Sequence, residues 1–143
     1  MLFFKQGLIA LFSGGAAWNS PSLKAILLSS YTYDSTHQFV SDIAFNELTG
    51  YDRPDVSASV IYNDGEDRLE LRFVDTTITA VADAQTVGAF ALFIEGEDDT
   101  DSDLIAYQTG VSEATNGGAI TLNAPPNSLG SDNFIFAVPR GGV

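Results

Sequence analysis

Residues 56–94 decide the fold class of this chain. They read VSASVIYNDGEDRLELRFVDTTITAVADAQTVGAFALFI. Over residues 69–74, apolar and polar side chains alternate, which is typical of a half-exposed antiparallel strand with Leu69, Leu71 and Phe73 inward. Asp64-Gly65 is a turn signal between this strand and the one before it. The strands predicted in this stretch span residues 56–63, 69–74, 76–81 and 87–94.

Working outward, short apolar runs predict more strands on both sides of this stretch. Residues 23–29 carry apolar side chains on both faces, which predicts a central strand. About eight short strands separated by turn signals are typical of a sandwich or barrel. We therefore expect a mainly β, antiparallel β-sandwich or jelly-roll-like fold. The further predicted strands span residues 23–29, 104–108, 119–123 and 133–138.

Helical patterns occur only in the first third of the chain. Within residues 2–12, apolar side chains recur at helical spacing, and Gly14-Gly15 ends the helix. Residues 37–48 are expected to form a second short helix with Phe39, Ile43 and Leu48 inward. The apolar run near the N-terminus is too short for a signal peptide, so we expect it to be part of the fold.

No linker interrupts the chain, so the sequence predicts a single domain over residues 1–143. An N-terminal helix or arm is expected over residues 1–15, followed by a β-rich body over residues 23–143. The predicted loop at residues 125–130 is followed by a strand-like segment, and it is therefore not a linker between domains.

The composition disfavours several classes of function. The 143 residues include no cysteine, and 19 Asp and Glu against 6 Lys and Arg give a net charge of −13. Nucleic-acid binding requires clustered cations, so no nucleic-acid partner is expected. The sequence contains no apolar run of membrane-spanning length, so no membrane partner is expected.

The sequence offers no motif for catalysis, and we expect neither an enzyme nor a cofactor. Its one histidine, His37, lies in a segment typical of a helix start, where Asp34 or Ser35 would be the cap. The acidic stretch at residues 95–103 resembles the start of a calcium loop. However, the sixth and twelfth positions counted from Asp99 hold Leu104 and Gly110 in place of the required glycine and glutamate. No metal is therefore expected, and a solvated hairpin tip is the preferred interpretation.

Four aromatic residues could form a platform for a sugar, although core or interface positions are more usual for such residues. These residues are Trp18, Tyr31, Tyr33 and Tyr51.

Several short motifs carry a resemblance to a known family. They are Lys5-x-Gly7-Leu8-x-x-Leu11-x-x-Gly14-x-x-x-Trp18, Leu23-Lys24-x-x-Leu27, Tyr31-Thr32-Tyr33, His37-x-Phe39-x-Ser41-Asp42-Ile43, Glu47-Leu48-Thr49-Gly50-Tyr51-x-Arg53 and Leu104-Ile105-Ala106-Tyr107. Together they resemble the small structural proteins in the virions of tailed bacteriophages. After Arg53 the chain departs from the family pattern: Pro54 replaces a glycine-rich stretch, and the acidic loop is longer.

The resemblance implies a structural component of the virion, not a catalyst. We expect a head decoration (cement) protein on the capsid exterior, a homotrimer whose partner is the major capsid protein. A tail or neck structural protein and a carbohydrate-binding β-sandwich module are the alternatives.

The N-terminal segment is more apolar than one face of a short helix can bury, and the excess is expected to meet another subunit. The alternative is that these residues pack into the core of the chain itself. The residues predicted to form the assembly interface are Phe3, Phe4, Leu8, Ile9, Phe12 and Trp18.

Overall fold

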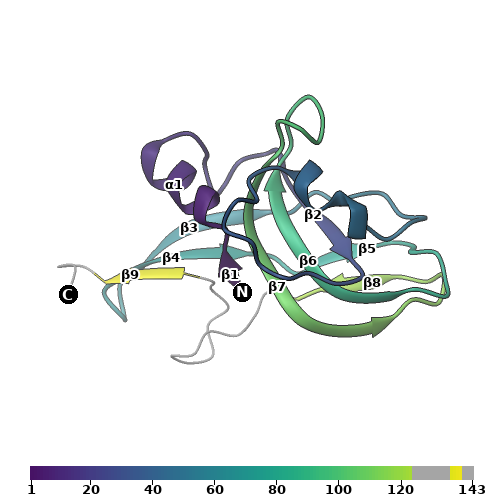
Figure 1. Ribbon diagram of the computed structural model, residues 1–143. Coiled ribbons are helices and arrows are strands. Elements are labelled where there is room, and N and C mark those ends of the chain that lie inside the picture. The colour runs from purple at the N-terminus through teal and green to yellow at the C-terminus, as the bar shows by residue number, and fades with distance from the viewer. Residues whose placement is uncertain (124–135, 140–143) are drawn as a thin grey trace.

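The computed structural model describes residues 1–123 and 136–139, and this part of the chain is mainly β with one α-helix. All strands pair antiparallel with their neighbours. They form three sheets with the orders β1-β7-β6-β2, β3-β4-β9 and β5-β8 (Figure 1). These features confirm the predicted antiparallel, sandwich-like β fold with a short N-terminal helix.

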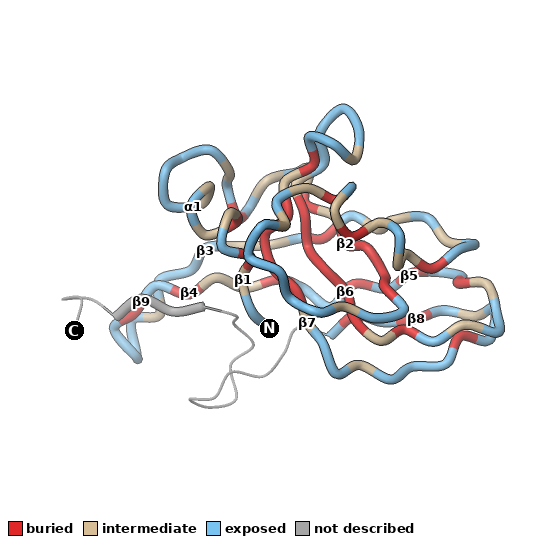
Figure 2. The backbone as a smooth tube through the Cα atoms, in the orientation of Figure 1, coloured by how far each residue is buried: buried red, intermediate tan, exposed pale blue. Residues whose placement is uncertain are grey.

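The largest sheet is built on the hairpin of β6 (Thr86–Ile94) and β7 (Asp103–Ala114). The edge strands β1 (Leu2–Phe3) and β2 (Leu23–Leu28) lie on either side of this hairpin. β7 is much longer than the strand predicted over residues 104–108. Most of the buried backbone lies in β2, β6 and the first half of β7 (Figure 2).

β2 was predicted to be a central strand, but it is the last strand of its sheet. It is nevertheless buried, because residues 46–56 run along its outer side. The N–H of Ala25 donates to the C=O of Pro54 at 3.1 Å, and the N–H of Val56 donates to the C=O of Leu23 at 2.9 Å. The apolar residues of both faces are therefore buried without a second neighbouring strand.

Each face of the largest sheet supports its own apolar core, because successive side chains of a strand point to opposite faces. The core on one face contains Phe4, Ile26, Leu28, Val40, Ile43, Phe93, Leu104 and Tyr107. The core on the other face contains Trp18, Leu23, Leu27, Phe73, Ile78, Val81, Phe90, Leu92, Ile105 and Leu122.

The second sheet joins β3 (Ala58–Asn63), β4 (Arg68–Phe73) and β9 (Phe136–Pro139). In Figure 1 it reaches away from the main sheet toward the side on which α1 lies. The third sheet pairs β5 (Thr76–Ile78), which is shorter than predicted, with β8 (Ile120–Leu122).

Part of the predicted C-terminal structure cannot be compared with the model. Of the strand predicted over residues 133–138, residues 133–135 lie outside the described residues. The predicted loop at residues 125–130 also lies outside them.

Helix α1 (Lys5–Ser13) ends at Gly14, whose φ of 83° is the left-handed conformation that favours glycine at a helix end. A Cβ on Gly7 would lie 2.6 Å from the backbone oxygens of both Leu104 and Ile105. Only glycine therefore lets the helix approach β7 so closely. Leu2–Phe3, which was predicted as the start of the helix, pairs with β7 as β1.

Residues 37–48 form no α-helix; the prediction is wrong here. Two short 3-10 turns, Val40–Asp42 and Ala44–Asn46, replace it. The backbone of this segment bonds to other parts of the chain: the N–H of Val40 donates to the C=O of Ser102 at 3.0 Å. Ile43 and Leu48 are buried as predicted, whereas Phe39 is half-buried.

The two faces of β4 also differ from the prediction. Glu70 is fully buried and Arg68 nearly so, whereas Leu69 is exposed. The half-exposed strand predicted from the alternation therefore has its charged face covered. Burial of Glu70 is possible because its carboxylate is paired with Arg68 and Arg72, as described below.

Candidate functional site

Two of the residues predicted to form an assembly interface belong to the chain's own core. Phe4 is fully buried against the main sheet, and Trp18 is almost fully buried in the opposite core. The indole N–H of Trp18 donates to the C=O of Arg72 at 2.8 Å. Neither side chain is available to a partner, so the prediction is wrong for Phe4 and Trp18.

The other four predicted residues remain at least partly accessible. Phe3 and Leu8 are half-buried, and the Phe3 ring contacts Trp18 edge-on with centroids 6.3 Å apart. Ile9 is 52% exposed and Phe12 is 71% exposed. The helix therefore has one buried face and one apolar face that is exposed in the structure.

The second sheet extends this exposed apolar surface. In the register of β3 and β4, Val60 lies opposite Leu71 and Tyr62 lies opposite Leu69. Cross-strand partners point to the same face of a sheet, so these four residues share one face. Val60, Tyr62 and Leu69 are all exposed. Sequence reasoning missed this contribution, because a strand pattern does not show which of its faces will be covered.

A groove of about 310 Å³ runs between α1 and this face of the second sheet. Its lining is almost entirely apolar and includes Trp18, of which only 3% is accessible. We call it the apolar groove. Its lining residues are Leu11, Phe12, Ala16, Ala17, Trp18, Asn19, Val60, Leu69 and Leu71.

The opposite face of the second sheet contains a buried carboxylate that is paired with two arginines. The Glu70 carboxylate accepts hydrogen bonds from Arg68 Nε at 2.8 Å, Arg72 Nε at 2.7 Å and Asn63 Nδ2 at 3.1 Å. Burial alone would raise the pKa of Glu70, but these hydrogen bonds outweigh it, and the pKa lies below its usual value. This face is therefore a structural ion-pair network.

A second network, also missed from the sequence, links the end of the motif at residues 47–53 to the acidic loop. Arg53 donates to Glu47 at 2.8 Å and 2.7 Å, and to Asp99 at 2.6 Å and 3.0 Å. The Tyr51 hydroxyl donates to Glu47 Oε1 at 2.6 Å, the same oxygen that accepts from Arg53 Nε. The signal was present in the sequence, because Glu47, Tyr51 and Arg53 are all specified residues of the motif Glu47-Leu48-Thr49-Gly50-Tyr51-x-Arg53.

The acidic loop is a hairpin tip between β6 and β7, and it is anchored both by Arg53 and by the backbone N–H groups of Val40 and Ser41, which donate to the C=O groups of Ser102 and Asp99. Hydrogen bonds from Arg53 hold the pKa of Asp99 below its usual value, whereas burial raises the pKa of Asp103. Asp98 and Asp101 are exposed and bond within the loop. In the part of the chain that the structure describes, no group of three or more His, Cys, Asp or Glu could hold a metal ion.

His37 lies in an aromatic cluster and not at a helix start. Its Nδ1 is 3.0 Å from the Tyr31 hydroxyl, and the Tyr31 ring packs edge-on against Phe4 and Tyr107. Burial raises the pKa of Tyr31 to about 12. The histidine is thus a half-buried packing residue with a neutral hydrogen-bond partner.

The four aromatic residues considered as a sugar platform are separated in the structure. Trp18 lies in one core, Tyr51 lies at the edge of β2, and Tyr31 and Tyr33 pack on the opposite face of the main sheet. Tyr33 stacks on Tyr107 with centroids 5.6 Å apart. They do not form one flat surface.

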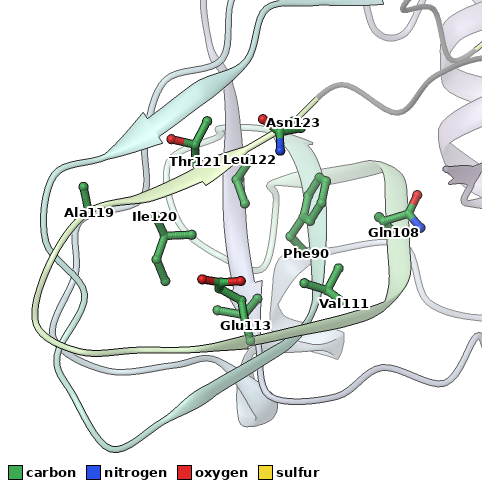
Figure 3. Close-up of a pocket in the computed structure, with 10 residues that line it drawn as sticks. Phe90, Gln108, Val111, Glu113, Ala119, Ile120, Thr121, Leu122 and Asn123 are labelled. Carbon is green, nitrogen blue, oxygen red and sulfur yellow. The ribbon is translucent and has the colours of Figure 1, made fainter.

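Figure 3 shows a further hollow of about 450 Å³ between β6, β7 and β8. Phe90, Val111 and Leu122 gather around it, and Glu113 is the only ionisable residue in its described lining. The Oε1 atom of Gln108, in the same lining, is buried without a hydrogen-bond partner among the described residues. One carboxylate and one amide do not form an acid–base or nucleophile–base pair.

Among the described residues, no helix is long and apolar enough to cross a membrane. Comparisons with protein families, with curated proteins and with solved structures found no match.

Proposed function

We propose that this chain is a structural protein of a tailed-phage virion, which binds the outside of the capsid shell and stabilises contacts between capsomers. The sequence motifs quoted above suggest the family. The observation that carries the proposal is the apolar groove, which Phe12 lines, together with the exposed side chain of Ile9 on the same helix. Exposed apolar surface of this kind is typical of protein–protein interaction sites.

The arrangement suits a cement protein in two further ways. The groove lies between a helix and a sheet that are both fixed to the main β body, so it is a preformed surface. The acidic loop carries several exposed carboxylates, which would be costly to desolvate at an interface. We propose that this loop points away from the shell and that the chain binds as a homotrimer bridging neighbouring capsomers.

Binding to the assembled shell in preference to its free subunits would stabilise the shell by mass action. The test compares purified shells with and without the added protein, for copy number by electron microscopy and for resistance to heat. Hundreds of copies per shell and a higher melting temperature would support the proposal. Shells equally stable with and without the protein would contradict it.

A matched pair of variants tests the surface. Phe12→Ser should lower shell occupancy, because it removes apolar area beside the groove. Phe45→Ser is the control, since Phe45 is 79% exposed and does not line the groove. Equal occupancy for both variants would place the contact elsewhere. A few copies at one vertex would indicate the tail or neck alternative, and binding on a glycan array would indicate the carbohydrate-binding alternative.

A further inference from the structure

Strand β3 is an edge strand, and among the described residues no strand pairs with its outer side. The sheet order β3-β4-β9 leaves β4 as its one neighbour. The middle of the strand is exposed on both faces, with Val60 44%, Ile61 39% and Tyr62 43% accessible. Because successive residues point to opposite faces, neither face of this part of β3 is covered.

The hydrogen-bond pattern between β3 and β4 shows which backbone N–H and C=O groups of β3 point away from β4. The N–H of Val74 donates to the C=O of Ser57 at 2.9 Å, and Ser59 lies opposite Arg72 in the ladder. In an antiparallel pair, alternate residues exchange hydrogen bonds with the partner strand. The odd-numbered residues of β3 therefore bond to β4. The N–H and C=O groups of Ala58, Val60 and Tyr62 point away from the sheet.

β3 lacks the features that usually protect an edge strand from pairing. Between Ala58 and Asn63 it has no charged residue and no proline, and its register with β4 has no bulge. Negative charge instead lies just beyond both of its ends. Asp55 precedes the strand, and the turn that follows it carries three acids: Asp64, Glu66 and Asp67.

Cations lie near two of these acids. Lys24 is shared by Asp55 at 3.5 Å and Glu95 at 3.4 Å, and Arg68 lies 3.7 Å from Glu66. Arg68 is also bonded to the buried Glu70. Acidic side chains thus lie beyond both ends of the edge, in a chain whose net charge is −13.

We propose that the free edge of β3 binds an extended segment of a partner protein, an apolar strand with Lys or Arg at both ends. The partner strand would pair with the outward N–H and C=O groups of Ala58, Val60 and Tyr62, a mode known as β-augmentation. Its terminal cations would meet the acids beyond both ends of β3. Complementary charge of this kind fixes register and suppresses wrong partners.

A second copy of this chain fits the edge poorly. Antiparallel pairing of two β3 strands about Val60 would set Asp64 of one chain opposite Val56 of the other, one residue from Asp55. The two-fold symmetry would repeat this contact between like charges at the other end. Like charges placed together in a strand pair are destabilising.

The side chains of the partner strand are also constrained. Val60 and Tyr62 share their face with Leu69 and Leu71, which are beside the apolar groove. Alternate residues of the partner would fall on this face, where apolar side chains bury the most surface.

The test uses the full chain and two synthetic peptides with the same alternating valine–threonine core. One peptide has lysines at both ends, and the other has glutamates. Amide hydrogen exchange is followed by NMR. We expect the lysine peptide to slow exchange at Val60 and Tyr62, while Ser59 and Ile61 are already slow in the free protein. The glutamate peptide should bind at least about tenfold more weakly.

A variant gives a second readout. Val60→Pro removes an outward N–H and leaves the bonds to β4 in place, so it should weaken binding of the lysine peptide at least about tenfold. If this variant does not fold, the comparison of the two peptides on the unchanged protein decides alone. Neither experiment contains capsid shells. The failure of the shell-decoration test of the proposed function would therefore leave the inference about the β3 edge unaffected.

Three results would overturn the inference. The first is no slowing at Val60 and Tyr62 by the lysine peptide, or equal binding of both peptides. The second is slow exchange at these amides in the free protein at every concentration, which would mean that the edge is already covered. The third is slow exchange that appears only as the protein concentration rises, which would make a second copy the occupant.

Discussion

The hydroxyl of Tyr51 takes the place of a backbone carbonyl beside Leu27. It accepts the N–H of Leu27 at 2.9 Å and donates its own proton to Glu47 Oε1 at 2.6 Å. Leu27 is fully buried, so this N–H has no access to water. Along the rest of its length, the outer edge of β2 is bonded by backbone groups of residues 46–56. The Tyr51 side chain thus supplies an acceptor along the outer edge of β2 that the backbone of residues 46–56 does not supply.

Tyr51→Phe should therefore lower the free energy of unfolding by about 1–3 kcal/mol, the cost of a buried donor left without a partner. Urea unfolding measures the change. Tyr33→Phe is the control: Tyr33 is exposed, so its loss of a hydroxyl should have little effect. Equal changes in the two variants would mean that the Leu27 N–H finds another acceptor.

Glu70→Ala should destabilise the chain by about 3–5 kcal/mol, because it leaves Arg68 and Arg72 without the carboxylate that neutralises them. Arg68 is nearly buried, so its charge cannot simply move into water. Thermal and urea unfolding both report this change. Glu97→Ala is the control variant, because it also removes a carboxylate, but from the exposed acidic loop. We expect it to change the free energy of unfolding very little. A small effect at Glu70 would contradict the network described here.

Acid should weaken the fold, in part through three carboxylates. Backbone N–H groups of Gln38 and Phe39 lower the pKa of Asp42, hydrogen bonds from Arg53 lower that of Asp99, and the arginines lower that of Glu70. A carboxyl group whose folded pKa is lowered stabilises the fold above its unfolded pKa, here 3.8 for Asp and 4.5 for Glu. That stability is lost as the pH falls through the folded pKa.

Asp103 has the opposite sign, since burial raises its pKa, and protonating it favours the folded state. The pKa values of Asp34 and Asp98 are also lowered, so five lowered values stand against one raised value, and the free energy of unfolding should fall as the pH drops below about 4.5. Asp99→Asn should flatten this curve slightly and cost less than about 1 kcal/mol at neutral pH, because the pair is partly exposed. A curve that rises on acidification would refute this prediction.

Within the N-terminal segment, substitutions of core residues should lower stability, whereas substitutions of surface residues should leave stability nearly unchanged. Phe4→Ala should cost about 3–5 kcal/mol, because the ring is fully buried. Ile9→Ala should change stability little, but it should lower shell occupancy if the proposed function is right. Deleting residues 1–12 would remove both kinds of residue, together with β1, and we expect it to unfold the protein. Full stability in Phe4→Ala would contradict the burial described here.

Much of the main sheet was predictable from the sequence, because its signals are local. The apolar runs at residues 23–29 and 87–94 match β2 and β6 closely, and Asp64-Gly65 lies in the turn between β3 and β4. Gly14 ends α1 as expected. In each case the deciding factor is the conformational preference of a few neighbouring residues, which the sequence contains in full.

The candidate site was predicted only in part. Ile9 and Phe12 are exposed beside the groove, but Phe4 and Trp18 are buried, although all four are apolar and lie in the same segment. Helical spacing groups residues by face; it does not show which face meets the rest of the protein. That choice depends on where β7 and the second sheet lie relative to the helix.

By itself, the sequence determined the strands β2 and β6 of the main sheet, the acidic net charge and the end of the first helix. Only the tertiary structure decided that Glu70 is buried among arginines, that residues 46–56 cover the outer side of β2, and that β3 keeps a free edge among the described residues. These outcomes depend on contacts between residues far apart in the chain. Whether a side chain is buried, or a strand is paired, depends on the segment that packs against it as much as on its own sequence. A local sequence pattern describes only one of the two segments in each contact.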